Sequence, residues 1–141
     1  MDPMRPASFL TLLSAVLLAG CASTLSDRDL EPYGVWEGTL PCADCPGIET
    51  RLALYKDPYT YRLEQTYLAR DNEPVIREGE WVLLPPVDNM DLGRISLKGE
   101  GETPLKQLQR LPGGNLKMLD QDGQPIRSTI DYTLERKRVS D

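Results

Sequence analysis

Two cysteines separated by two residues, Cys42 and Cys45, are the residues most able to do chemistry in this sequence, and Asp44 stands between them. Two thiols at this spacing can hold a soft metal ion, form a disulfide or exchange electrons with another thiol. The chain contains no histidine, which excludes catalysis by a histidine base and metal binding by imidazole. A metal site in this chain must therefore use sulfur and oxygen ligands.

The metal interpretation favours Cu(I), because this ion prefers sulfur ligands and accepts low coordination numbers. Zinc usually takes four ligands, and the sequence has no second C-x-x-C or C-x-x-H. Cys42 and Cys45 are thus the expected metal ligands, and Asp44 is a candidate for an accessory oxygen ligand. Met90 or Met118 could add a thioether, although methionine more often fills core or loop space.

The disulfide interpretation fits an oxidising compartment. A bridge across two intervening residues closes a very small loop, so the chain-entropy model predicts a weak staple. A thioredoxin-type pair needs its first cysteine at a helix N-terminus, where the thiol pKa falls. Pro41 and Pro46 bracket the motif and favour a turn instead, which disfavours the thioredoxin interpretation. The metal and disulfide interpretations both stay open.

The N-terminal segment indicates the compartment. Residues 1–20 combine a basic residue at Arg5, an apolar run over 9–18 and two small residues. These features predict a secretory signal peptide, since the run is shorter than a membrane span of roughly 20 residues. Residues 18–21 resemble a bacterial lipobox, whose cysteine accepts diacylglycerol. We therefore expect lipidation at Cys21, with acyl chains that anchor the protein stably.

The residue after the lipidated cysteine indicates the membrane. In the enterobacterial sorting rule an aspartate there retains a lipoprotein in the inner membrane, whereas this chain has Ala22. The sequence thus predicts a periplasm-facing protein that the lipoprotein sorting machinery delivers to outer-membrane lipid. Residues 21–31 are predicted to form the lipidated N-terminus and a flexible tether, and 32–141 the folded domain. A net charge of −6 argues against nucleic-acid binding.

The folded part alternates apolar and polar residues with a period of two. The alternating segments cover 48–55, 59–67, 78–83, 94–98, 116–118 and 130–134, with turn residues between them. One apolar and one polar face is typical of an antiparallel sheet that is buried on one side. About eight strands fit, and closure would remove exposed edges. We predict an all-β, up-and-down barrel or half-open barrel, with the C-x-x-C motif on a hairpin connection between Leu40 and Ile48.

Several side chains receive structural predictions within this barrel. Leu105, Leu108 and Leu111 are spaced by three, which we interpret as a bulged strand that switches face. Gly47 allows unusual backbone angles in the loop that carries the motif. The two tryptophans are expected to fill the barrel interior. Four tyrosines are expected to pack across strands with their hydroxyls in water: Tyr59, Tyr61, Tyr67 and Tyr132.

Residues 33–55, YGVWEGTLPCADCPGIETRLALY, resemble the N-terminal domain of the NlpE (CutF) family of copper-resistance outer-membrane lipoproteins. In that family a similar block opens a small lipocalin-like barrel. The resemblance implies a non-enzymatic role in copper tolerance, with Cys42 and Cys45 as copper ligands. It also implies signalling of surface or lipoprotein-trafficking stress to a Cpx-type sensor kinase system. The best-known members carry a further C-terminal OB-fold domain with cysteines, and functions that rest on it are not expected for a chain ending at Asp141.

Two other functions stay open. The barrel could carry a small apolar ligand, although large inward side chains such as Trp36 and Trp81 count against a wide cavity. Alternatively the chain could be a structural interaction module of the envelope, with Cys42 and Cys45 permanently bridged. Enzymatic hydrolysis by paired carboxylates is not expected, because nothing in the sequence places acidic residues in a cleft.

Overall fold

The computed structural model describes residues 31–86, 89–101 and 104–138. The predicted signal peptide, Cys21 and all of the predicted tether except Glu31 lie outside these residues. The described part is all-β, as predicted. Its strands are β1 (Gly34–Leu40), β2 (Ile48–Tyr55), β3 (Thr60–Tyr67), β4 (Val75–Leu84), β5 (Arg94–Lys98), β6 (Pro104–Arg110), β7 (Leu116–Met118) and β8 (Thr133–Lys137).

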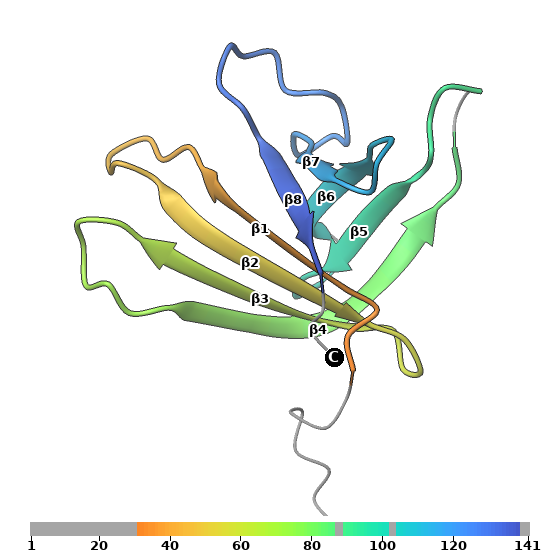
Figure 1. The fold of residues 1–141 in the computed structure, drawn as a ribbon, viewed down its shortest axis with the longest axis horizontal. Coiled ribbons are helices and arrows are strands. Elements are labelled where there is room, and N and C mark those ends of the chain that lie inside the picture. The colour runs from red at the N-terminus through yellow and green to blue at the C-terminus, as the bar shows by residue number, and fades with distance from the viewer. Residues whose placement is uncertain (1–30, 87–88, 102–103, 139–141) are drawn as a thin grey trace, which may run out of the picture.

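The strands form a closed up-and-down barrel (Figure 1). Each strand pairs antiparallel with the next, and β8 returns to pair with β1 through Val35, Trp36 and Glu37. Of the two predicted forms, the closed barrel is therefore the correct one. Closure pairs the edges that β1 and β8 would otherwise expose, which protects the domain from edge-to-edge association.

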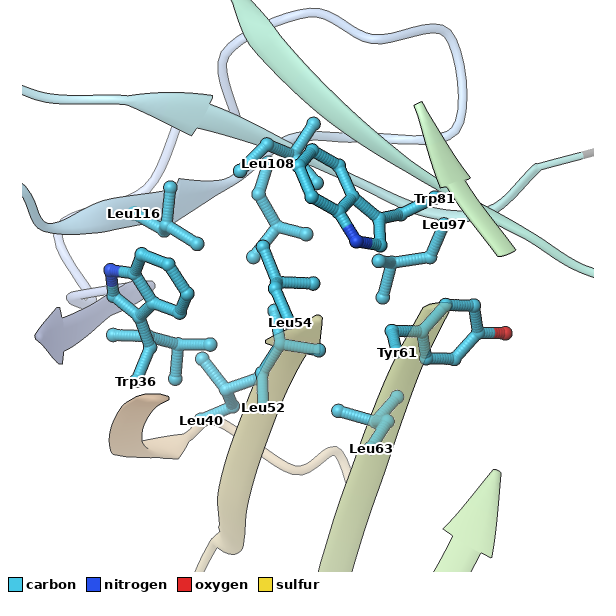
Figure 2. Packing of buried hydrophobic residues seen from close by; sticks show 12 residues of the cluster. Trp36, Leu40, Leu52, Leu54, Tyr61, Leu63, Trp81, Leu97, Leu108 and Leu116 are labelled. Atoms are coloured by element: carbon cyan, nitrogen blue, oxygen red, sulfur yellow. The ribbon is translucent and has the colours of Figure 1, made fainter. Parts of the chain in front are cut away.

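The core is a continuous leucine-rich cluster in the barrel interior. Because side chains alternate across a strand, each strand contributes one face to this cluster: Trp36, Leu40, Leu52, Leu54, Tyr61, Leu63, Trp81, Ile95, Leu97, Leu108, Leu116 and Leu134. Figure 2 shows Trp36 and Trp81 on either side of Leu54. Both tryptophans are at most 4% exposed, so the prediction that they fill the interior is confirmed.

Both indole N–H groups have partners, as buried polar groups require. Trp36 Nε1 donates to the carbonyl of Gly114 at 2.7 Å, and Trp81 Nε1 donates to the carbonyl of Tyr55 at 2.8 Å. These bonds fix each ring between its strand and a neighbouring turn or strand end. The tryptophans are thus held in orientation as well as buried.

Tyr61 contradicts the prediction that its hydroxyl lies in water. The residue is 3% exposed, and its hydroxyl donates to the carbonyl of Lys98 at 2.7 Å. Burial raises the pKa of this hydroxyl. The ring lies over Gly79, where an added Cβ would come within 3.0 Å of a ring carbon. The side chain is inward because the glycine of the paired strand leaves room for it.

β4 bends from one half of the barrel to the other (Figure 1). It pairs with β3 as far as Thr60 opposite Glu80, and with β5 from Trp81 to Leu84. The predicted bulge is confirmed on β6: Leu97 pairs with Lys106 and the next residue of β5 pairs with Pro104, so one residue of β6 is left over. The extra residue allows two leucines spaced by three to face the same core.

The last strand begins later than predicted. The alternation suggested a strand over 130–134, but β8 begins at Thr133, and Ile130 is 55% exposed. Local side-chain bonds explain the difference. The hydroxyl of Ser128 accepts the N–H of Ile130 at 3.1 Å, and Asp131 Oδ1 accepts the N–H of Thr133 at 2.9 Å. These turns use backbone donors that a longer ladder would need.

The described strands and their core lie entirely within residues 34–137. The chain that begins at residue 22 therefore contains everything that the barrel requires, and the experiments below use it where a soluble protein is needed. Among the described residues, no helix is long and apolar enough to cross a membrane.

Candidate functional site

The C-x-x-C motif lies on the connection between β1 and β2, as predicted. The last ladder pair before the connection is Leu40 with Ile48, and residues 41–47 form a series of bends without regular structure. In an up-and-down barrel, the β1–β2 connection lies at the end opposite the β2–β3 turn. The motif is thus at the far end of β1 from the point where the chain enters the barrel (Figure 1).

The two motif sulfurs are bonded to each other in this structure. Cys42 and Cys45 form a disulfide, with their Cα atoms 5.3 Å apart. Both residues are partly exposed, and Asp44 is exposed. The Cys42 sulfur lies 3.5 Å from Asp44 Oδ1, and the Cys45 sulfur lies 3.3 Å from the carbonyl of Gly47. The pair is therefore accessible to a reductant, an oxidant or a metal ion from solvent.

An ion pair joins this loop to the β3–β4 turn. Arg70 donates to Asp44 Oδ2, and its guanidinium also lies 5.4 Å from the centre of the Tyr67 ring. Both charged side chains are about half exposed or more, and exposed pairs contribute little stability. The pair instead sets which way the Asp44 carboxylate points, because it holds one of the two oxygens toward the neighbouring turn.

Gly47 is required for close approach rather than for unusual backbone angles. Its φ is not positive, so the turn does not use the backbone freedom that a glycine allows. A Cβ at this position would lie 2.6 Å from the Thr39 methyl carbon, closer than side chains tolerate. The Gly47 carbonyl accepts the backbone N–H of Leu68 at 3.0 Å. The glycine thus lets the loop close tightly over β1 and bond to the end of β3.

The motif also offers a compact donor set for a metal. One sulfur from each cysteine and one carboxylate oxygen of Asp44 lie within 4.8 Å of one another. Metal–thiolate bonds are roughly 2.3 Å long, so one ion could reach all three atoms with a small opening of the loop. A disulfide has no thiolate to give, so this donor set fits a soft metal once the bridge is reduced.

The two methionines do not join this donor set. Met118 packs against the barrel core, and Met90 lies in the β4–β5 connection, where it is 91% exposed. Arg70 contacts the motif from 26 positions away and was not predicted from the sequence. No local signal marks this residue, because its approach depends on where the β3–β4 turn falls in the barrel.

Comparison with known proteins identifies the family of the domain. The sequence model described as "NlpE N-terminal domain" matches residues 36–129. The chain is also 37% identical to "Lipoprotein NlpE" of Escherichia coli (strain K12) over 142 aligned positions, which cover 93% of this chain. This chain belongs to the NlpE family. Cys42 and Cys45 lie within the matched NlpE domain, and Cys21 precedes it.

Two solved structures share the fold of this NlpE domain. The crystal structure described as "the Cpx pathway activator NlpE from Escherichia coli" is 32% identical, with a TM-score of 0.51 over 78% of this chain and 54% of that one. A lipoprotein from Shewanella oneidensis is 28% identical, with a TM-score of 0.56 over 79% of this chain and 94% of that one. The match covers 56% of the curated E. coli relative, so this chain spans about half the length of that protein.

Proposed function

We propose that this chain is a non-enzymatic outer-membrane lipoprotein that reports envelope stress, and that Cys42 and Cys45 form a redox-gated Cu(I) site. The match to the NlpE family supports the first part, together with a structural relative described as a Cpx pathway activator. The second part is supported by the compact set of two sulfurs and one carboxylate on an exposed loop. This donor set is the observation that carries the copper proposal.

The proposed lipid anchor limits how far the C-x-x-C site can lie from the membrane. Twelve residues, 22–33, separate Cys21 from the start of β1, and an extended chain of this length spans at most about 40 Å. β1 then carries the chain over seven residues to the motif, roughly a further 20 Å. The chain enters the barrel at the end where β1 begins, so the C-x-x-C loop would lie at the periplasmic end, farther from the anchor along the chain.

The redox state would decide whether copper binds. The bridged form offers no thiolate, whereas the reduced form offers Cys42 and Cys45 to Cu(I), a soft ion that suits two sulfur ligands. Asp44 could add an oxygen by exchanging its ion pair with Arg70 for the metal. Because Arg70 belongs to the β3–β4 turn, metal binding would then change the contact between two loops at the periplasmic end, where a partner could detect it.

The anchor is tested by labelling cells with a radioactive fatty acid. We expect the wild-type chain to incorporate the label and to fractionate with the outer membrane. A Cys21→Ala variant should incorporate none. Equal labelling of the two proteins would contradict lipidation at Cys21.

The signalling role is tested with a transcriptional reporter of a Cpx-type two-component system. The chain is expressed in cells that lack other NlpE-type proteins, with and without added copper. We expect the reporter to respond to the wild-type chain, and the Cys42→Ser/Cys45→Ser variant to lose the copper-dependent part of that response. A variant that responds to copper as the wild type does would exclude copper sensing through this pair. A reporter that ignores the wild-type chain would exclude the signalling role.

A further inference from the structure

A pocket of about 510 Å³ opens at the end of the barrel where β1 begins, away from the Cys42–Cys45 bridge. It exists because β4 is longer than its partner β3. Their pairing ends at Thr60 opposite Glu80, whereas β4 continues to Leu84 beside β5. The β2–β3 turn and Tyr33 lie across from this continuation, and the space between them is the pocket.

One wall of the pocket is a cluster of three aromatic rings. Trp81 is fixed by two hydrogen bonds, from its indole to the Tyr55 carbonyl at 2.8 Å and from its backbone N–H to the Tyr59 carbonyl at 3.2 Å. Tyr33 stacks on the Trp81 ring at 6.3 Å and Tyr59 meets it edge-on at 5.0 Å. The wall is therefore rigid and ready to receive an apolar group.

An apolar side chain extends this wall into solvent. Leu83 follows Trp81 on the same face of β4 and lines the pocket, yet it is 53% exposed. Tyr59 is 51% exposed and Tyr33 is 38% exposed. Contiguous exposed apolar surface of this kind is typical of a binding site. The pocket volume also lies within the range of small-molecule sites, roughly 300–1,000 Å³.

The charges around the pocket are positive although the chain is acidic. Lys98 lines the pocket but is paired with Glu80 at 3.0 Å, so these two charges cancel. Lys56 and Arg110 also line it, and no carboxylate of the described residues is within ion-pair distance of either. Lys56 Nζ lies 3.8 Å from the centre of the Tyr33 ring, and Arg110 donates to the carbonyl of Leu92 at 3.2 Å. Two cations thus stand beside an apolar wall in a chain of net charge −6.

We propose that this pocket binds an aliphatic monocarboxylate of medium chain length. The hydrocarbon would lie on the exposed Tyr59 and Leu83 side chains, over the buried Trp81 ring. The carboxylate would meet Lys56 and Arg110, which also line the pocket. The site goes beyond the proposed copper and stress-reporting function and uses none of its residues. It also differs from a carrier cavity inside the barrel, because the core side chains fill that interior.

The probe for the test is decanoate, titrated calorimetrically into the chain that lacks residues 1–21. Matched titrations use 1-decanol and decyltrimethylammonium, which share the hydrocarbon and differ in charge. We expect decanoate to bind at one site, roughly tenfold more tightly than decanol, as one charge-assisted hydrogen bond would give. The cationic probe should bind more weakly than decanol. Equal binding of all three probes, or no binding of decanoate, would overturn the proposal.

Two variants locate the site. Leu83→Glu places a negative charge in the pocket, and we expect it to weaken decanoate binding by roughly tenfold or more. Its matched control is Ile130→Glu, since Ile130 is exposed to a similar extent, 55%, and lies outside the pocket. Lys56→Gln with Arg110→Gln should weaken decanoate and leave decanol unchanged, which tests the charge while keeping every aromatic ring of the wall. Binding of decanoate that survives all of these changes would place it elsewhere and overturn the proposal.

Discussion

Reduction of the Cys42–Cys45 bridge is predicted to cost the barrel about 2 kcal/mol of unfolding free energy. The bridge closes a loop of four residues. In the chain-entropy model, closing such a loop removes about 2.1 + 1.5R ln 4, or about 6 cal/mol/K, from the unfolded chain, which is about 2 kcal/mol at 25 °C. This value is small because the unfolded chain already keeps residues three apart close together.

The folded state should survive reduction. Neither cysteine belongs to the core cluster, and the connection is held independently of the bridge. Leu40 pairs with Ile48 at its base, and the Gly47 carbonyl accepts the N–H of Leu68 at 3.0 Å. A native domain is usually stable by about 5–15 kcal/mol, so a loss of about 2 kcal/mol leaves it folded. A folded reduced state is a precondition for copper binding.

The assay is urea unfolding of the chain that lacks residues 1–21, followed by tryptophan fluorescence with and without a phosphine reductant. With a slope of about 2 kcal/mol/M, the midpoint should fall by about 1 M. The Cys42→Ser/Cys45→Ser variant should unfold at the lower midpoint and should not respond to the reductant. A reduced protein that is unfolded in water, or a loss above about 4 kcal/mol, would refute the reasoning, because the loop would then carry structure that the entropy argument omits.

Three further predictions concern the barrel itself. Tyr61→Phe should lower the unfolding free energy by about 1 kcal/mol, because it leaves the buried Lys98 carbonyl without its partner; urea unfolding measures the loss, and an unchanged midpoint would contradict it. Gly47→Ala should lower the unfolding free energy by about 1–3 kcal/mol, because the new methyl group would contact the Thr39 methyl carbon. Adding Thr39→Ser to this variant should restore much of the lost stability. A double variant no more stable than the single one would show that this contact is not the cause. Lys106→Met should stabilise the protein at neutral pH, because burial, helped by Arg77, lowers the pKa of Lys106 and penalises its charged form. That penalty is present below the folded-state pKa and fades as the pH rises to the ordinary lysine pKa. The stability advantage of the variant should therefore shrink when unfolding is measured at alkaline pH. An advantage that does not change with pH would show that packing, and not the charge, is its cause.

The barrel could be predicted from the sequence because the alternation of apolar and polar residues in each strand shows which face of that strand lies against the core. In β2 the core-facing pair is Leu52 and Leu54, and in β5 it is Ile95 and Leu97. Each pair is two residues apart, so the pattern assigns both residues to one face of the strand whatever the arrangement of the strands. The sequence also located the C-x-x-C loop, since Leu40 and Ile48 mark the ends of the flanking strands. The start of β8 was misplaced because Ser128 and Asp131 divert nearby backbone donors into local turns. These side chains compete with the ladder in a way that an alternating pattern does not show.

The remaining features depend on distances between segments far apart in the sequence. The role of Gly47 follows from the nearness of Thr39 across the hairpin, and the ion pair of Asp44 follows from the place of Arg70 at the end of β3. The aromatic pocket exists because β4 extends beyond the end of its pairing with β3. The sequence of neither strand alone shows this difference in length. Alternation therefore predicts which residues face the core, and the register between strands decides which of them meet at a site.

The most direct test of the central claim is a Cu(I) competition titration of the reduced chain that lacks residues 1–21. It is carried out without oxygen, against a chromophoric chelator of known affinity. We predict that the wild-type protein removes one Cu(I) per chain from the chelator. The oxidised protein and the Cys42→Ser/Cys45→Ser variant should remove none, because neither offers the pair of thiolates. Equal copper uptake by the double-serine variant would contradict the proposed site.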